Sequence, residues 1–433
     1  MATLDGLAFH PDPEPVPFAP DPAAALPDGA EVVVVGAGML GASAAHRLAL
    51  AGMRPLVIEA NAPAFGASGR LAGMALAGLG GHFPRVTRLV QAAGGRSILD
   101  YTARSLAILR ELDSTLPGGI EWEDVGSLDL AVTEAEEAHV RRMAELQRAE
   151  GLAVEILEAD ELATRQPSLA AAAVRAAKWT PGDGTLNPFR LVYRLLEAAQ
   201  ARGASIVTGV RVEELLVRSG RVTGVRTSHG PVAAPSVLLA TNAWTPSLVP
   251  WVRDALTPIR EHVLVTEPVP MRLGPGFETN QCNEYWRQMR TGEVLIGGFA
   301  VADEGMGIGS YSMAVRPAVP PLLARLLGQL HPALRDVRVV RAWAGLLDFA
   351  TLEIPLAGRL CTEDGTVVPG AFLGCGLTGH GLPYTPVLGL LLAELIADGA
   401  ARTLSLDPFD PRRYAGLTAA PTWLDPFRGV VTG

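Results

Sequence analysis

Residues 31–59 read EVVVVGAGMLGASAAHRLALAGMRPLVIE, and this stretch decides the fold class. The four consecutive valines, Val32 to Val35, are typical of a strand that is buried on both faces. Helical spacing follows from Met39 to Ala51, and a second apolar strand, Leu56 to Ile58, ends at Glu59. Because right-handed crossovers join such strands in parallel, the stretch predicts a compact strand–helix–strand unit at the start of an α/β domain.

The turn between the first strand and the helix carries glycines with GxGxxG spacing. Gly36 permits a tight turn, Gly38 lets backbone approach a pyrophosphate, and Gly41 lets the helix pack closely on the strand. The helix N-terminus offers N–H groups to phosphates. Glu59 is placed to accept hydrogen bonds from ribose hydroxyls and would repel a 2′-phosphate, which disfavours NADP. Directly after a buried strand, the motif predicts a dinucleotide site in a Rossmann-like domain.

Two further runs of small residues favour FAD over NAD. Residues 66–73, GASGRLAG, follow the second strand, and residues 374–382, GCGLTGHGL, run into an apolar helix near the C-terminus. Small residues let a flat ring lie against backbone, and a helix N-terminus stabilises negative charge on a reduced flavin. A plain NAD enzyme would leave both loops unexplained.

Composition and charge narrow the class of protein. The 433 residues are 48% hydrophobic, which is globular, and the net charge of −9 argues against a nucleic-acid partner. Cys282, Cys361 and Cys375 are too dispersed for a disulfide scaffold or a metal site. Residues 1–27 lack a secretory signal, and the most apolar stretch, Val387 to Ala397, is shorter than the roughly 20 residues that span a bilayer. We therefore expect a soluble cytoplasmic protein without a membrane span.

Periodicity and turn signals place the remaining elements. A proline-rich segment, residues 9–28, predicts an extended arm, because proline at this density cannot hold a helix or a central strand. Asn187 and Pro188 form a helix start, and Ser219-Gly220 indicates a hairpin. Helices are predicted at Leu106–Leu116, Glu134–Glu150, Asn187–Arg202, Val319–Leu330 and Thr385–Ala397. Strands are predicted at Val210–Val217, Arg221–Thr227, Val237–Ala240, His262–Thr266, Val294–Ile296 and Ala371–Gly374.

Over about residues 30–400 the chain resembles the FAD-dependent amine and amino acid oxidoreductases, the group of glycine oxidase, sarcosine oxidase and D-amino acid dehydrogenase. The order and spacing of the motifs are more specific than any one of them. The motifs are VVVVGAGMLGASAAHRLALAG (32–52) with Glu59, GASGRLAG (66–73), DGTLNPFRLVYRLLEAAQARGA (183–204), GVRVEELL (209–216), VTGV (222–225), VLLATNAWT (237–245), TPIREHVLVTEP (257–268), EYWRQMRTGEVLIGG (284–298), RAWAGL (341–346) and GCGLTGHGL (374–382).

The resemblance implies an α/β fold in which a Rossmann-like FAD-binding domain carries an inserted α+β substrate domain built on a mixed β-sheet. It places the FAD-binding domain at residues 30–100, 152–243 and 336–415. The substrate domain would take residues 101–151 and 244–335. A proline-rich arm, 1–29, precedes them, and a tail, 416–433, follows.

The resemblance also implies non-covalent FAD, because no cysteine lies near Gly345 and no histidine stands in the GASGRLAG loop. No metal is expected. The residues expected to bind the cofactor are Gly36, Gly38, Met39, Leu40, Gly41, Glu59, Ala60, Ser68, Gly69, Arg70, Leu71, Ala72, Val212, Thr241, Trp244, Gly345, Gly379, His380, Gly381 and Leu382.

The implied reaction moves a hydride from the carbon next to nitrogen of a small amine or amino acid to flavin N5, and the imine product hydrolyses in water. Tyr285 and Arg287 would face the substrate from the sheet, with Arg287 binding a carboxylate through two hydrogen bonds; the alternative for Arg287 is a surface strand edge. His380 is the third catalytic candidate. His82 is a weaker candidate for the same region, and Trp244 and Trp343 are candidates for the pocket wall.

The sequence departs from the group at positions that bear on substrate and acceptor. Leu347 stands where amino acid oxidases of the group often have arginine, and Asp348 beside it would suit a cationic group instead. Leu295 replaces the lysine that assists oxygen reduction in sarcosine oxidases. We therefore lean towards a dehydrogenase that passes electrons to a quinone or protein partner rather than to O2.

Two other functions stay open from the sequence. The same scaffold could take hydride from a 2-hydroxy acid. The chain could also be a non-catalytic flavoprotein subunit that binds a larger complex through its proline-rich arm. The substrate, the acceptor and the oligomeric state, including whether the chain forms an oligomer at all, are not determined by the sequence.

Overall fold

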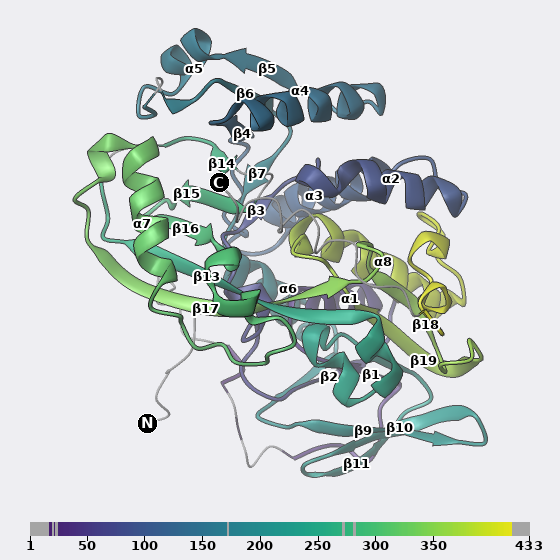
Figure 1. Ribbon diagram of the computed structural model, residues 1–433. Coiled ribbons are helices and arrows are strands. Elements are labelled where there is room, and N and C mark those ends of the chain that lie inside the picture. The colour runs from purple at the N-terminus through teal and green to yellow at the C-terminus, as the bar shows by residue number, and fades with distance from the viewer. Residues whose placement is uncertain are drawn as a thin grey trace.

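A computed structural model describes residues 17–19, 21, 25–170, 173–270, 273–279 and 283–417. Two large sheets and the helices that cover them make up the molecule (Figure 1). The α/β class, with a Rossmann-like unit and a second, mixed sheet, is as predicted from the sequence.

The first large sheet has six strands in the order β18-β19-β12-β1-β2-β8. All neighbours pair in parallel except β18 and β19, and the predicted parallel pairing of the first two strands is confirmed. Helix α1 packs against both α6 and α8 beside this sheet. The bounds are β1 Val32–Val35, β2 Pro55–Glu59, β8 Ser205–Thr208, β12 Val237–Leu239, β18 Leu356–Cys361, β19 Val367–Cys375, α1 Met39–Leu50, α6 Pro188–Gln200 and α8 Gly381–Asp398.

Local signals in the sequence explain several of these elements. The β1 valines are buried, as a strand with helices on both sides requires. Asn187 caps α6 by accepting the backbone N–H groups of Phe189 and Arg190, as predicted. The predicted hairpin forms between β9 (Val212–Arg218) and β10 (Arg221–Thr227), with Ser219 and Gly220 both at positive φ.

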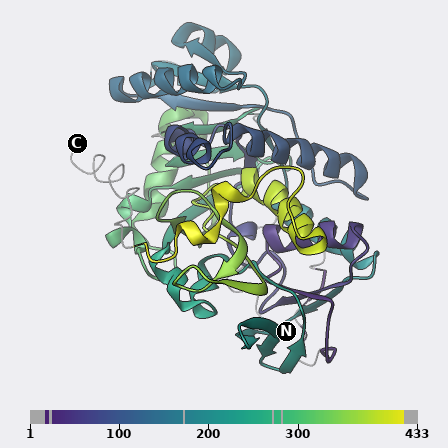
Figure 2. The same ribbon diagram turned by 90° about the vertical axis from the view of Figure 1, so that its right-hand side faces the viewer.

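A small antiparallel sheet extends this hairpin by a third strand. Strand β11 (Gly230–Ala233) pairs with β10, so the order is β11-β10-β9. Both views place the small sheet at one end of the molecule, far from α4 and α5 at the other end (Figure 1, Figure 2).

The second large sheet has eight strands in the order β17-β13-β16-β15-β14-β4-β6-β5. It is mixed, because β14 and β4 pair in parallel and the other neighbours pair antiparallel. Helix α7 covers β13 and β16, and α4 covers β4 and β6. The bounds are β4 Ser127–Ala131, β5 Glu155–Glu158, β6 Ala176–Thr180, β13 Leu256–Thr266, β14 Gly276–Thr279, β15 Glu284–Gln288, β16 Val294–Gly298, β17 Val339–Ala350, α4 Glu134–Ala149 and α7 Val319–Leu330.

The remaining described elements complete the layers between and around the sheets. Strands β3 and β7 pair antiparallel as a two-stranded sheet. The bounds are β3 Met74–Ala75, β7 Gly184–Thr185, α2 Phe83–Ala92, α3 Leu99–Thr115 and α5 Ala159–Arg165.

The predicted domain boundaries differ from this arrangement in three places. Strands β5 and β6 belong to the eight-stranded sheet, although residues 152–243 were assigned to the FAD-binding domain. Strand β17 also belongs to that sheet, although it lies after the predicted boundary at residue 336. Helix α3, placed in the substrate domain, packs against α8. Strand pairing over long sequence separations, which a local pattern does not contain, accounts for these differences.

Helix α8 begins four residues before the predicted Thr385. Its 18 residues make it long and apolar enough to cross a membrane by length and composition, so the expectation that this stretch is too short is wrong. In the structure 61% of the helix is buried, and it packs against α1 and α3. This burial is typical of a helix in the core of a domain.

Part of the predicted N-terminal arm falls on described residues. The Thr208 hydroxyl donates to the carbonyls of Phe18 and Ala19, and the Asp21 N–H donates to the Thr208 carbonyl. These contacts attach the described part of the arm to the end of β8. The rest of the arm, and the predicted tail from residue 418, lie outside the described residues.

Candidate functional site

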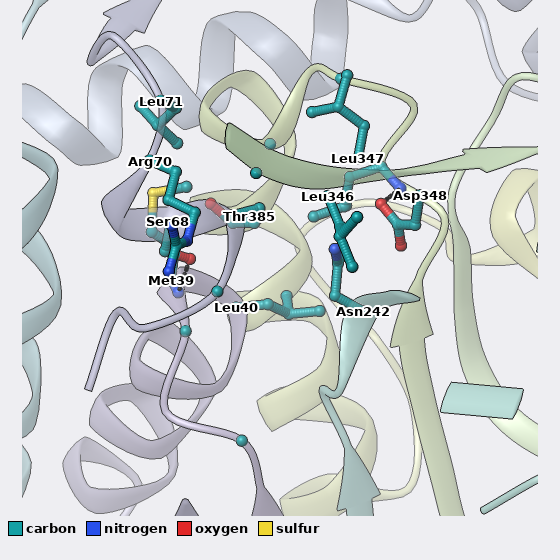
Figure 3. Close-up of a pocket in the computed structure, with 18 of the residues that line it drawn as sticks. Met39, Leu40, Ser68, Arg70, Leu71, Asn242, Leu346, Leu347, Asp348 and Thr385 are labelled. Carbon is teal, nitrogen blue, oxygen red and sulfur yellow. Dashed lines mark hydrogen bonds between the residues drawn. The ribbon is translucent and has the colours of Figure 1, made fainter. Parts of the chain in front are cut away.

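One cavity of about 650 Å³ extends from the turn after β1 to the face of the eight-stranded sheet that is turned away from α7. This volume is typical of small-molecule and cofactor sites. Figure 3 shows Ser68 and Arg70 on one side of it and Leu346 and Asp348 on the other. The predicted residues that line the cavity are Gly36, Gly38, Met39, Leu40, Glu59, Ala60, Ser68, Arg70, Leu71, Ala72, Val212, Thr241, Trp244, Gly345, Gly379, His380, Gly381, Leu382, Tyr285 and His82.

The turn between β1 and α1 lines the cavity and packs closely on the backbone that follows β12. Gly36 has φ +104°, and a Cβ added there would lie 2.6 Å from the Ala240 carbonyl oxygen. Gly41 and Gly69 were expected to touch the cofactor, but neither lines the cavity. A Cβ on Gly41 would meet the Gly36 carbonyl, so this glycine allows α1 to pack against the turn. The cradle fits a dinucleotide phosphate at a helix N-terminus.

Two side chains hold this turn from the cavity side. Glu59 accepts the Ala37 N–H on one carboxylate oxygen and the Asn61 N–H on the other, each at 2.8 Å. Ser68 Oγ accepts the Met39 N–H at 2.9 Å, which ties the second loop to the first turn of α1. Burial raises the pKa of Glu59, and the backbone N–H groups act in the opposite direction.

Arg70 connects the second loop to the eight-stranded sheet. Its guanidinium donates to the carbonyls of Phe65 and Ala344, each at 3.0 Å. Trp343 Nε1 donates to the Arg70 carbonyl at 3.0 Å. Trp343 was expected in the pocket wall, but it is not among the residues that line the cavity. Burial lowers the pKa of Arg70. The Arg70 guanidinium thus spans the loop and β17.

The sheet wall of the cavity contains an acid that the sequence analysis missed. Ile259, Glu261 and Val263 alternate along β13 and face the cavity. Tyr285 Oη donates to Glu261 Oε2 at 3.2 Å. Burial, together with the nearby charge of Glu284, raises the pKa of Glu261 to about 7, and the hydrogen bond from Tyr285 acts in the opposite direction. The signal in the sequence that could have identified Glu261 was an acidic residue between two apolar residues on the same face of a strand.

Arg287 does not face the cavity, so its predicted contact with a substrate carboxylate is wrong. Its Nε donates to the Ala72 carbonyl at 2.5 Å and its Nη2 to the Leu186 carbonyl at 2.9 Å. It lies on the same strand face as Tyr285, two residues further along β15, where the loop around Ala72 covers the sheet. Arg287 therefore anchors the loop around Ala72 to β15.

Asp348 lines the cavity but is held by backbone. Its carboxylate accepts the N–H groups of Gly376 and Leu377. With its amide nitrogen turned towards the acid, Asn242 donates to both oxygens at 2.7 and 2.8 Å, and the two side chains adjoin in Figure 3. Burial raises the pKa of Asp348 to about 7. Asp348 thus positions the C-terminal glycine loop, and the suggested contact with a cationic group is not supported.

His380 and His82 meet at the cavity with their rings edge to face, 5.1 Å between centroids. Burial lowers the pKa of His380 to about 4, so its imidazole is neutral at neutral pH. Its Nδ1 carries the proton, because the partner at 2.8 Å is the Thr378 carbonyl, which can only accept. His82 Nδ1 lies 3.0 Å from Glu353, which also pairs with Arg85 at 3.1 Å.

The residues present fit FAD. The cradle at Gly36 would hold phosphate, Glu59 lies where a ribose hydroxyl could be bound, and the loop from Gly379 to Leu382 forms the start of α8 at the far wall. Contact of each of these residues with the cofactor remains a prediction.

Comparison with known proteins supports the same cofactor. The model of the DAO family, described as FAD dependent oxidoreductase, matches residues 31–395. Glycine oxidase of Geobacillus kaustophilus is 28% identical over 390 residues, 89% of this chain and 97% of that protein. Hydrogen cyanide synthase subunit HcnC of Pseudomonas aeruginosa is 29% identical, and the match spans only 61% of each chain.

Solved structures show the same fold. L-proline dehydrogenase from P. horikoshii superimposes with a TM-score of 0.77 at 22% identity, covering 90% of this chain and 98% of that one. Glycine oxidase from Geobacillus kaustophilus gives a TM-score of 0.76 at 24% identity, covering 89% and 98%. The family model spans most of the sequence, and the chain belongs to the DAO family of FAD-dependent oxidoreductases, the family of amino acid and amine oxidases and dehydrogenases.

Proposed function

We propose that this enzyme oxidises a small amine or amino acid at a C–N bond with non-covalently bound FAD. FAD, when bound, supplies the acceptor for a hydride from the carbon next to nitrogen, and the imine product hydrolyses in water. Similarity to glycine oxidase and to the human mitochondrial sarcosine dehydrogenase, which is 26% identical over 93% of this chain, supports amine chemistry.

The observation that carries this proposal is the continuity of the cavity. The phosphate cradle at Gly36 and the tyrosine–acid pair on the sheet, Tyr285 and Glu261, line the same enclosed space. A dinucleotide anchored at one end therefore leaves the other end for a small substrate. The chain's own contribution is to position both molecules and to exclude water.

Non-covalent binding is proposed on the side chains that line the cavity. Neither Cys361 nor Cys375 is among them, and both are buried elsewhere as free thiols. Acid precipitation separates the two cases: a non-covalent flavin stays in the supernatant, whereas a covalent one remains with the pellet.

The electron acceptor is proposed to be a quinone or a protein partner. Leu295 is buried on β16 where sarcosine oxidases have the lysine that assists oxygen reduction, so this position offers no charge to stabilise superoxide. A 2-hydroxy acid, the alternative substrate, and an amino acid would both need a cation for their carboxylate, and Arg287 is turned to backbone instead. This contact therefore favours an amine over either acid.

An anaerobic substrate panel tests the proposal. Yellow protein is mixed with amines, amino acids and 2-hydroxy acids, and flavin absorbance is followed before air or an artificial acceptor is added. We expect bleaching by an amine or amino acid, and faster recovery with the artificial acceptor than with air. Bleaching only by hydroxy acids would favour the alternative substrate. No bleaching by any of them would favour a non-catalytic flavoprotein.

A further inference from the structure

The substrate end of the cavity is acidic. Glu261, Glu278 and Glu284 line it from β13, β14 and the start of β15 in the eight-stranded sheet, where β16 lies between β13 and β15. Glu278 lies directly opposite Tyr285 in the strand pairing, and Tyr285 donates to Glu261. All four residues line the cavity, and we call the three acids and the tyrosine together the acidic wall.

Of the described arginines that line the cavity, one is engaged with backbone and the other lies at the cofactor end. Among the described residues that line the cavity, the arginines are Arg70 and Arg211. Arg70 donates to two backbone carbonyls, and Arg211 lies beside Val212 next to the end of β2, where the Val210 N–H meets the Glu59 carbonyl. The single lysine, Lys178, pairs with Asp129 at 3.6 Å and does not line the cavity.

The wall suits a positive group but not the reacting amine itself. A carboxylate next to an amine raises the pKa of that amine and keeps it as an ammonium. The nitrogen whose neighbouring carbon loses hydride must be neutral, so a carboxylate at this point would hinder the reaction. A second, permanent ammonium on the same substrate would instead be bound by the carboxylate with a charge-assisted hydrogen bond.

We propose that the substrate is a diamine or polyamine whose non-reacting ammonium binds Glu261 on the acidic wall, and that no substrate carboxylate is required. This inference rests on the proposed function, because it takes the other nitrogen to be the one that is oxidised. Tyr285 positions the Glu261 carboxylate by its hydrogen bond and leaves the second oxygen, Oε1, for the ligand.

Glu261 must be ionised to bind a cation, which makes the binding dependent on pH. The groups that act on it are Tyr285 and Glu284 from β15, and Arg70 packs on Gly345, the β17 residue that pairs with Glu261. Glu278 on β14 lies further away, beyond Tyr285. Burial and the charge of Glu284 raise the pKa of Glu261 to about 7. Cation affinity should therefore increase from pH 6 to pH 8.

A pair of inert ligands that carry the same tert-butyl group tests the inference by binding alone. tert-Butylammonium and pivalate differ in the sign of their charge, and neither has a hydrogen on the carbon that bears the charged group, so neither can be oxidised there. Isothermal titration calorimetry with the flavin-loaded enzyme at pH 8 should give a Kd for the cation at least 10-fold below that for the anion. Equal affinities, or tighter binding of pivalate, would overturn the inference.

Variants then locate the site. Glu261→Gln keeps an acceptor for Tyr285 and should weaken tert-butylammonium binding at least 10-fold, with no loss of affinity for pivalate. Glu261→Asp keeps the charge and should retain preference for the cation, which excludes misfolding as the cause. Glu267→Gln is the matched control, because Glu267 pairs with the exposed Arg338 at the far end of β13 and should change neither Kd. Unchanged cation binding in Glu261→Gln would refute the site.

The two proposals fail in different ways. Oxidation of glycine or N-methylglycine, together with tighter binding of pivalate, would refute the diamine inference and leave the proposed function standing. Selective binding of tert-butylammonium without bleaching by any amine would refute the proposed function instead. Both hold if 1,4-diaminobutane bleaches the flavin at concentrations at least 10-fold below those needed for butylamine.

Discussion

At the scale of single residues, the pair of Glu261 and Tyr285 makes a prediction about stability. The folded pKa of Glu261 is about 7, above the ordinary value of 4.5, so the folded state holds a proton that the unfolded state has lost. Stability from this group is therefore complete below about pH 4.5 and decreases as the pH rises to about 7.

Replacing Glu261 by a residue that does not titrate tests the predicted decrease of stability with rising pH. In Glu261→Gln the neutral amide replaces the protonated acid, so the Tm of the variant relative to wild type should rise between pH 5 and pH 8. Differential scanning calorimetry of the ligand-free protein measures it. A Tm difference that stays constant, or falls with pH, would show that the folded pKa of Glu261 is not raised.

Arg287 supplies a second prediction at this scale. Arg287→Ala leaves the buried carbonyls of Ala72 and Leu186 without their donor, which should cost about 2 kcal/mol of unfolding free energy. In the fraction of the variant that retains flavin, the substrate KM should change less than twofold. Arg290→Ala, at an exposed arginine 3.9 Å from Glu123, is the matched control for stability. A large rise in KM with unchanged Tm would show that Arg287 contacts the substrate, as the sequence predicted.

Glu59 supplies a third prediction at this scale, because its carboxylate holds the turn between β1 and α1. Glu59→Ala removes the acceptor for the N–H groups of Ala37 and Asn61 and should lower the flavin content of purified protein at least several-fold. The ratio of visible to protein absorbance measures the content. Glu31→Ala, which removes an exposed acceptor for the Arg54 N–H, should leave it unchanged. Full flavin content in Glu59→Ala would count against the assigned cofactor end.

At the scale of elements, the glycine turn should tolerate no side chain at Gly41. A Cβ there would collide with the Gly36 carbonyl, so Gly41→Ala must move the start of α1 away from β1. We expect a lower Tm and loss of flavin. Gly182→Ala is the control, because a Cβ there meets no atom within 4 Å and its φ is not positive. Normal flavin content in Gly41→Ala would contradict the packing that we describe.

The sequence predicted elements whose cause lies within a few residues. The valine run of β1, the Asn187 cap and the Ser219-Gly220 hairpin are all in place, because backbone burial, capping and turn geometry are local properties. The pairing of β4 with β6 and with β14 was not predicted, since these partners lie far apart in the chain.

The same distinction separates the two ends of the site. Apart from Gly41 and Gly69, the residues predicted at the cofactor end from the glycine motifs line the cavity. At the substrate end, Arg287 was misassigned and Glu261 was missed. Which of two polar residues on one strand face reaches a cavity depends on the loops that cover the sheet, and here the loop at Ala72 covers Arg287.

At the scale of the whole molecule, the two large sheets meet at one cavity that joins a phosphate cradle to an acidic wall. Oxidation of a C–N bond by bound FAD is the central claim, and single-turnover stoichiometry tests it most directly. Flavin-loaded enzyme is mixed anaerobically with 1,4-diaminobutane, butylamine or an amino acid, and carbonyl product and reduced flavin are measured together. We predict one carbonyl compound per flavin reduced, with the nitrogen released as amine or ammonia; for 1,4-diaminobutane the amino aldehyde cyclises with loss of water, so its cyclic imine is counted. Flavin that stays oxidised with every amine, or is reduced without either product, would contradict the account.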